Sequence, residues 1–182
     1  MNSAGLREEE ITLFPLFFNQ TLQIKTMKKT FFIIPGLGHN TQRRCYRALG
    51  ASAREKGYEV VNKNPNWKRI LSEQIFPVSE HDIIFGFSLG AVLACMIGQK
   101  YNCEKIILAS MTPLERYSEN QIAIILKSPE MANDLKSMSN EKPTSKTIKI
   151  YGDLEKSKGN ITVENTGHEL TDAYLKTIID LL

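Results

Sequence analysis

The chain alternates between short, continuously apolar runs and longer stretches in which apolar residues recur every three or four positions. Apolar runs rich in isoleucine, valine and phenylalanine are typical of strands buried on both faces. We expect strands at 29–35, 58–62, 81–87, 105–109, 147–151 and 161–164. The intervening patterns predict helices over 41–56, 66–76, 89–101, 120–127, 130–138 and 169–182. This alternation predicts an α/β protein, a three-layer sandwich with a mostly parallel central sheet and helices on both faces.

Residues 1–26 do not follow this rhythm. A chain of 182 residues is long enough to bury the core of one domain. We therefore expect a single domain over 27–182. For the leader, 1–26, two forms stay open: a disordered appendage, or an edge strand or hairpin formed by residues 11–24.

The composition excludes several classes of protein. A content of 42% hydrophobic and 24% charged residues, with a net charge of +3, is ordinary for a globular protein. The sequence has no stripe of basic residues of the kind that would indicate a nucleic-acid partner. No apolar run reaches the length of about 18 residues that a membrane span needs. Cys45, Cys95 and Cys103 lack the spacing of metal ligands. We expect a cytoplasmic protein without a metal.

The segment 86–90 places the pattern Gly-x-Ser-x-Gly, centred on Ser88, between a predicted strand and a predicted helix. A strand that turns at once into a helix holds one side chain above the sheet edge, and flanking glycines remove side chains that would collide there. The backbone N–H of Leu89 then lies at a helix start, where donors are unpaired. We interpret Ser88 as a candidate nucleophile and Leu89 as a candidate oxyanion donor; the alternative is a flexible turn before a helix.

A serine nucleophile needs a base within hydrogen-bond reach, and the chain has 3 histidines. Loops that leave the carboxyl ends of parallel strands gather at one edge, which is the edge of Ser88. His81 enters its strand from the opposite edge, and His39 lies in the loop expected to shape the oxyanion pocket. His168 follows the last predicted strand at the correct edge. It is the preferred base, with a capping role near a helix start as the alternative.

In these features the chain resembles the α/β-hydrolase superfamily, in particular small bacterial-type serine esterases with little or no lid. The resemblance covers 27–182 and rests on the turn at 86–90, on Pro-Gly-Leu-Gly at 35–38, and on His168 after the last strand. It implies the compact form of that fold, a serine hydrolase without a metal or organic cofactor, and a small-molecule acyl substrate.

The resemblance also assigns roles to the loop after the first strand. The backbone N–H groups of Leu37 and Leu89 would form the oxyanion hole. Gly36, Gly38 and His39 would lie beside the substrate. The family often has a histidine where this chain has a proline before Gly36, which matters little when the donor is a backbone group.

In the family the acid commonly follows the penultimate strand, and Tyr-Gly-Asp-Leu-Glu at 151–155 offers two candidates. Spacing from Gly152 favours Glu155, whereas residue type and closeness to the strand favour Asp153, which we prefer narrowly. The alternative for either is a solvated turn carboxylate.

Only eight residues separate Gly152 from Ile161, whereas a parallel crossover usually needs about a dozen or more. We expect either an extended loop that returns to start the last strand, or a hairpin. A hairpin would send His168 to the edge opposite Ser88, so this connection decides whether the proposed triad assembles.

Residues 111–146 leave the strand ending at 109 on the edge of Ser88. Their apolar side chains either line an acyl pocket or, as we prefer, pack ordinary flanking helices onto the sheet; they include Ile122, Ile124, Ile125, Leu126, Met131, Leu135 and Met138. A large lid does not fit in this segment, which favours a shallow pocket for small or short-chain acyl groups.

Two functional hypotheses follow. The first is a serine hydrolase that cleaves a small carboxylic ester or thioester through an acyl-enzyme, with amidase or acyltransferase activity possible on the same apparatus. The second is a catalytically silent α/β-hydrolase fold used as a binding module, which the short connection before His168 favours. The oligomeric state stays open.

Overall fold

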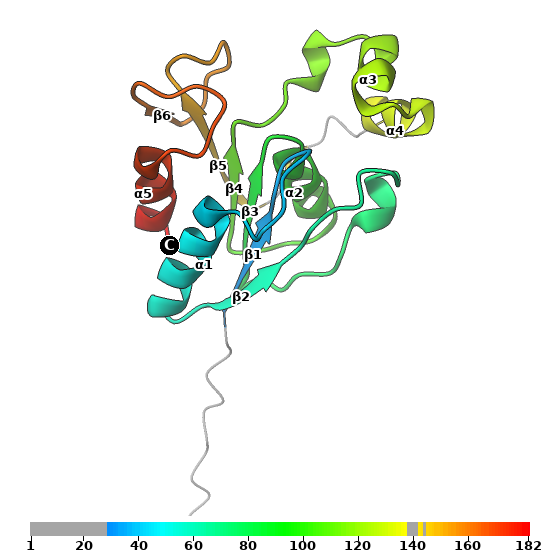
Figure 1. The fold of residues 1–182 in the computed structure, drawn as a ribbon. Coiled ribbons are helices and arrows are strands. Elements are labelled where there is room, and N and C mark those ends of the chain that lie inside the picture. Colours follow the sequence, from blue (N-terminus) through cyan, green and yellow to red (C-terminus); the bar gives the residue numbers. More distant parts are fainter. Residues whose placement is uncertain (1–28, 138–141, 144) are drawn as a thin grey trace, which may run out of the picture.

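A sheet of six parallel strands forms the centre of the computed structural model, which describes residues 29–137, 142–143 and 145–182 (Figure 1). The strands are β1 (Thr30–Ile34), β2 (Glu59–Asn62), β3 (Ile83–Phe87), β4 (Lys105–Ala109), β5 (Lys146–Gly152) and β6 (Ile161–Val163). Their order in the sheet is β2-β1-β3-β4-β5-β6. All five residues of β3 are buried, which explains its continuous apolar run, since helices cover both faces.

Helices lie on both faces of this sheet. They are α1 (Arg44–Glu55), α2 (Leu89–Lys100), α3 (Glu119–Leu126), α4 (Pro129–Lys136) and α5 (Asp172–Asp180), with 3₁₀ turns at Ser72–Gln74 and Leu114–Arg116. α1 and α5 pack on one face and α2 on the other, each against its own hydrophobic core (Figure 1). Nine of the twelve residues of α2 are buried. The predicted three-layer α/β sandwich is confirmed, and the sheet is parallel throughout the described residues.

α3 and α4 form a pair at the end of the sheet where the strands terminate (Figure 1). Each begins at a serine whose side chain caps the helix: Ser118 accepts from the N–H of Gln121, and Ser128 from the N–H of Met131. Met131 is buried in the core on the α2 face, together with Leu135. The pair therefore serves partly as a flanking layer, the role that we preferred for it from the sequence.

The helix predicted over 66–76 is wrong. This segment is an irregular loop that contains only the 3₁₀ turn Ser72–Gln74. The side-chain amide of Gln74 accepts from the N–H of Asn66 and donates to the carbonyl groups of Asn66, Arg69 and Ile70. A polar side chain that satisfies backbone groups in this way offers the chain an alternative to a helix.

The connection from β5 to β6 is a parallel crossover without a helix. β6 pairs with β5 in parallel register, Ile150 opposite Ile161 and Gly152 opposite Val163. The hairpin alternative is therefore excluded. Residues 153–160 return as an extended loop, so the chain after β6 emerges at the carboxyl edge of the sheet, together with the chain after β3.

The predictions for residues 1–26 and for Met138 lie outside the described residues. Within the described part of the chain, no helix is long and apolar enough to cross a bilayer.

Candidate active site

Ser88 lies in the sharp turn from β3 into α2, at φ 56° and ψ −122°, a conformation that side-chain-bearing residues rarely adopt. The two glycines around it have backbone close by. A Cβ on Gly86 would lie 2.4 Å from the carbonyl oxygen of Gly90, and a Cβ on Gly90 would lie 2.3 Å from that of Pro35. The turn predicted at 86–90 is present, and it depends on both glycines because no side chain fits at either.

The loop after β1 passes directly beside the serine. A Cβ on Gly36 would lie 2.9 Å from the Cβ of Ser88, so only glycine permits this approach. Leu37 and Leu89 line the same cavity as Ser88. As the first residue of α2, Leu89 has an N–H without an intrahelical acceptor. The residues expected to supply oxyanion donors therefore flank the serine.

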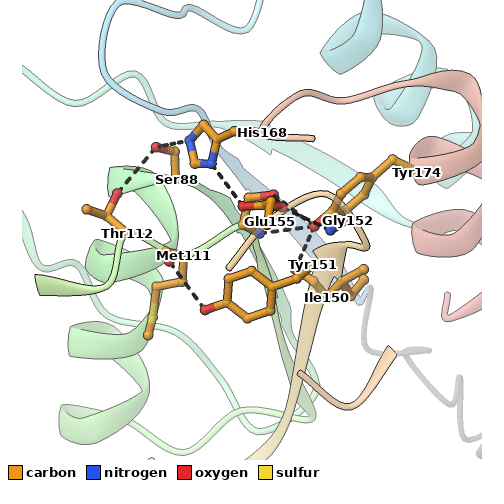
Figure 2. Close-up of polar contacts among 10 residues, drawn as sticks. Ser88, Met111, Thr112, Ile150, Tyr151, Gly152, Glu155, His168 and Tyr174 are labelled. Atoms are coloured by element: carbon orange, nitrogen blue, oxygen red, sulfur yellow. Dashed lines mark hydrogen bonds and ion pairs between the residues drawn. The ribbon is translucent and has the colours of Figure 1, made fainter. Parts of the chain in front are cut away.

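His168 reaches Ser88 from the loop after β6 (Figure 2). Its Nε2 lies 2.9 Å from Ser88 Oγ, and its Nδ1 lies 3.1 Å from Glu155 Oε2. An ionised carboxylate only accepts hydrogen bonds, so Nδ1 carries the proton towards Glu155 and Nε2 is left to accept from the serine hydroxyl. This arrangement is able to activate a hydroxyl for nucleophilic attack.

Glu155 follows β5 in the helix-free crossover, and its side chain is only 11% exposed. Its second oxygen, Oε1, accepts from Ser110 Oγ at 2.6 Å and from the N–H of Gly152 at 2.9 Å. Burial raises the pKa of Glu155, but the hydrogen bonds from His168, Ser110 and Gly152 outweigh it and hold this pKa below its ordinary value. The carboxylate facing His168 is therefore ionised at neutral pH.

The structure differs from our narrow preference for Asp153 as the partner of the histidine. Asp153 is exposed, and its Oδ1 accepts from the N–H of Thr166 at 3.0 Å. That hydrogen bond, followed by others from backbone groups, lowers the pKa of Asp153. The spacing argument for Glu155 agrees with the geometry because the tight turn after Gly152 directs the third residue, and not the first, towards the histidine. Asp153 instead ties the crossover to the loop that carries His168.

His39 contacts the site indirectly. Its ring stacks on Phe87 at 5.7 Å between centroids, and the ring of Phe87 lies 5.2 Å from that of His168. Its Nδ1 lies 3.1 Å from the buried hydroxyl of Tyr46. Burial, with smaller effects from the charges of Arg43 and His168, lowers the pKa of His39. The opposite-edge position of His81 is also as expected, since it precedes β3.

A cavity of about 320 Å³ opens beside Ser88 and His168. Its wall is mainly apolar and comes from the segment after β4 and from α3, through Pro113, Leu114, Tyr117, Ile122, Ile125 and Leu126. In the loop after β1, Leu37 is the only one of the described residues 36–39 that lines this cavity. Two larger cavities, of about 940 and 750 Å³, include neither Ser88 nor His168.

The apolar residues of segment 111–146 thus have different roles. Ile122, Ile125 and Leu126 line the cavity. Ile124 is 76% exposed. Met131 and Leu135 are core residues.

Comparisons with solved structures identify this architecture. No family model and no curated protein sequence matches the chain. Est1E from Butyrivibrio proteoclasticus matches with a TM-score of 0.61 at 12% identity, over 85% of each chain. A variant of tomato methylketone synthase I complexed with β-ketoheptanoate matches with a TM-score of 0.58 at 13% identity, over 85% of this chain and 95% of that one. A structure from Agrobacterium vitis reaches a TM-score of 0.61 at 9% identity, over 85% of this chain and 86% of that one. The chain has the α/β-hydrolase fold.

This α/β-hydrolase-fold protein has three further polar residues at the site that sequence reasoning missed. Thr112 Oγ1 lies 3.4 Å from Ser88 Oγ (Figure 2). Ser110 contacts Glu155, and the hydroxyl of Tyr174 lies 3.0 Å from Ser110 Oγ. One signal was present in the sequence: Ser110 directly follows a predicted strand at the edge of Ser88. No pattern singles out Tyr174, because an aromatic residue on the last helix is read as core.

Beyond the site around Ser88, the described residues bring together few groups that could bind a metal ion or act as a nucleophile. Within the described ranges, no cluster of three or more histidine, cysteine, aspartate or glutamate side chains is arranged to hold a metal ion. Cys45, Cys95 and Cys103 are free thiols. Burial raises the pKa of Cys95 and of Cys103, which keeps both thiols protonated and unreactive.

Proposed function

We propose that the protein is a serine hydrolase that cleaves a small carboxylic ester or thioester through an acyl-enzyme. A single observation carries the proposal: Ser88 Oγ, the imidazole of His168 and the carboxylate of Glu155 lie in one hydrogen-bonded row, at 2.9 and 3.1 Å (Figure 2). The row stands at the carboxyl edge of the sheet, beside an apolar cavity. Because the fold alone does not define an activity, the site carries the argument.

In the first half of the reaction, Ser88 Oγ attacks the carbonyl carbon of the substrate while His168 Nε2 takes its proton. The tetrahedral intermediate collapses as His168 returns this proton to the leaving alcohol or thiol, and an ester on Ser88 remains. In the second half, a water molecule attacks that ester, His168 takes a proton from the water, and the acid is released as Ser88 regains its hydroxyl hydrogen.

Two other parts of the site support these steps. The backbone N–H groups of Leu37 and Leu89 are the donors that we assign to the oxyanion, and the helix start at Leu89 adds a favourable dipole. Glu155 keeps Nδ1 protonated and stabilises the imidazolium that forms when His168 takes the serine proton. Asp153 has no direct part in this scheme.

The cavity supports a small, apolar acyl group. Its volume of about 320 Å³ is at the lower end of the range of ligand sites, roughly 300 to 1,000 Å³. The free thiols fit a cytoplasmic protein.

A fluorophosphonate probe tests the nucleophile. We expect rapid covalent labelling of the wild type and none of Ser88→Ala, with ester turnover lower by on the order of 10⁵-fold or more. Ser79→Ala is the matched control, because Ser79 is exposed and distant in the fold from the site, and it should be labelled like the wild type. A wild type that the probe does not label would contradict the proposal and favour a non-catalytic binding module.

A series of p-nitrophenyl esters tests the acyl pocket. We expect kcat/KM to be highest for short acyl chains and to fall for long ones. Ile125→Ala should lower kcat/KM for a butyrate ester by about five- to tenfold, at the low end of the roughly 1 to 3 kcal/mol that apolar contact contributes in such pockets, because Ile125 is 56% exposed. Ile124→Ala is the control, because Ile124 does not line the cavity. Equal effects of both substitutions would place the acyl group elsewhere.

The same apparatus can attack amides or transfer the acyl group to another acceptor. Product analysis with an ester and its matched amide, with and without an added alcohol, distinguishes these reactions from hydrolysis. The non-catalytic alternative rested on the short connection before His168, and the hairpin form of that connection does not occur, because β5 and β6 are parallel.

A further inference from the structure

The carboxylate of Glu155 is held from behind by a buried pair of hydroxyl groups that the mechanism above does not use. We propose that Ser110 and Tyr174 are positioning residues that fix the Glu155 carboxylate against His168. This inference rests on the proposed function, in which Glu155 orients the base. It extends the site from three residues to five, and the two additions come from the end of β4 and from α5.

The protons of this group have a definite arrangement. Ionised Glu155 has no proton to give, so the Ser110 hydroxyl must donate to it across the 2.6 Å contact. The hydroxyl of Tyr174 gives its one proton to the carbonyl oxygen of Ile150 at 2.5 Å, so it meets Ser110 as an acceptor, from the Ser110 N–H at 3.1 Å. The same N–H also donates to the carbonyl oxygen of Ile150 at 2.8 Å. The two hydroxyl oxygens lie 3.0 Å apart with no proton left between them, so Tyr174 holds Ser110 through its backbone and packs against its side chain.

The backbone conformation at Ser110 indicates that the side-chain hydroxyl has a role at this position. Ser110 is fully buried and has φ 45°, in the left-handed region that favours glycine. Glycine would relieve this strain, yet the chain has a residue whose side chain donates the shortest hydrogen bond to Glu155. A buried hydroxyl without a partner would be costly, and here the Ser110 hydroxyl donates to Glu155 and the Tyr174 hydroxyl to the carbonyl oxygen of Ile150.

The position of Tyr174 links the two sides of the carboxylate. Tyr174 is fully buried between α5 and the sheet, and its N–H donates to the side chain of Thr171, which caps α5. It lies six residues after His168, so one short segment supplies both the imidazole in front of Glu155 and the phenol behind it. A shift of this segment would therefore move both contacts together.

The crossover explains why such support is needed. Glu155 lies in a loop without a helix, next to Leu154, which is 73% exposed. Apolar packing of the loop is therefore slight around Glu155. Its hydrogen bonds to Ser110 and to the N–H of Gly152 replace the packing that a helix in the crossover would supply.

Carboxyl ¹³C NMR tests the proposal without requiring turnover. The Glu155 signal is assigned by its loss in Glu155→Gln and followed with pH in the wild type, Ser110→Ala, Ser110→Gly and Tyr174→Phe. Removing the Ser110 hydroxyl takes away a donor to the anion, so the pKa of Glu155 should rise towards its ordinary value. Tyr174→Phe should give a smaller rise. The titratable groups that face Glu155 are His168, Tyr151 and Tyr174, and all but the last are unchanged in every variant.

The pH dependence of probe labelling is the second readout. In Ser110→Ala and Ser110→Gly we expect labelling slower by on the order of tenfold and an acid limb moved to higher pH. Ile178→Val is the control, because Ile178 is a buried residue of the same helix outside the group; it should lower stability and leave the acid limb in place. Ser110→Gly suits the local backbone and keeps the test available if another variant fails to fold.

The outcomes separate the two proposals. A Glu155 titration that is the same in Ser110→Gly as in the wild type overturns the positioning role, whatever the activity. A wild type that is not labelled overturns the proposed function, and the NMR titration still decides whether Ser110 and Tyr174 hold the carboxylate.

Discussion

The two halves of the candidate active site are built by different physical means. Ser88 is placed by backbone packing, where Gly86 and Gly90 approach neighbouring chain too closely for any side chain. Glu155 and His168 are placed by hydrogen bonds among loops, next to the three-residue strand β6. At Gly86 and Gly90 the serine half therefore tolerates no added atom, whereas the acid and base half depends on particular polar atoms. Substitutions that add atoms should damage the serine half, and substitutions that remove polar groups should damage the acid and base half.

Removing the charge of Glu155 should give the largest effect on the acid and base half. Glu155→Gln keeps the shape of the side chain, but its amide no longer selects the imidazole tautomer that leaves Nε2 free. We expect kcat to fall by about 10³- to 10⁴-fold, with little change in the labelled fraction at long times. Steady-state turnover of a short ester measures this loss.

Asp153→Asn is the matched control for that substitution. The amide oxygen of asparagine still accepts from the N–H of Thr166, so we expect less than about a tenfold loss. A greater loss for Asp153→Asn than for Glu155→Gln would reverse the assignment of the acid and remove the contrast between the two carboxylates.

Adding one methyl group should give the next largest effect, now on the serine half. In Gly90→Ala the new Cβ would lie 2.3 Å from the carbonyl oxygen of Pro35, and backbone cannot move aside cheaply. We expect a loss of about 3 kcal/mol in the free energy of unfolding, measured in urea. Gly38→Ala meets no atom within 4 Å and should cost only about 1 to 2 kcal/mol for its positive φ. Equal losses of unfolding free energy in the two variants would show that backbone conformation, and not close contact, determines which residues the serine half accepts.

Lowering the pH should reduce the stabilisation from the two halves unequally. This is the smallest of the effects that we predict. The pKa of Glu155 is below its ordinary value of 4.5, so the folded protein binds this proton less readily than the unfolded chain. The stabilisation is complete above about pH 5 and is lost as pH falls through the folded pKa. The difference in unfolding free energy between the wild type and Glu155→Gln should shrink from pH 6 to pH 3. The difference between the wild type and Ser88→Ala should stay level, and a parallel decline would contradict the assignment of the effect to Glu155.

The serine half was predictable from the sequence because its constraint is steric and local. Glycines on both sides of Ser88, between an apolar strand and an apolar helix, form a pattern that a tight strand-to-helix turn requires and that an ordinary loop does not. The strand and helix pattern also predicted the layers of the fold, since each buried strand shows as a continuous apolar run.

The acid and base half was only partly predictable because its contacts cross between distant segments. His168 followed from topology, but the preference for Asp153 overlooked how the turn after Gly152 directs the next side chains. Ser110 and Tyr174 were missed, since a buried hydroxyl looks like any core residue until its partner is known. The helix predicted over 66–76 failed for a related reason: one amide, Gln74, replaces the helical hydrogen bonds.

The short β5–β6 crossover has a consequence for heat inactivation. The segment from Asp153 to Thr171 is attached to the sheet through the three residues of edge strand β6 and a few hydrogen bonds, such as those that Glu155 accepts from Ser110 and Gly152, so we expect it to open at a lower free energy than the central strands. The proposed acid and base, Glu155 and His168, both belong to it. Amide hydrogen exchange should show this segment exchanging ahead of β3, and the proposed activity should disappear on warming while the sheet and the turn at 86–90 are still folded.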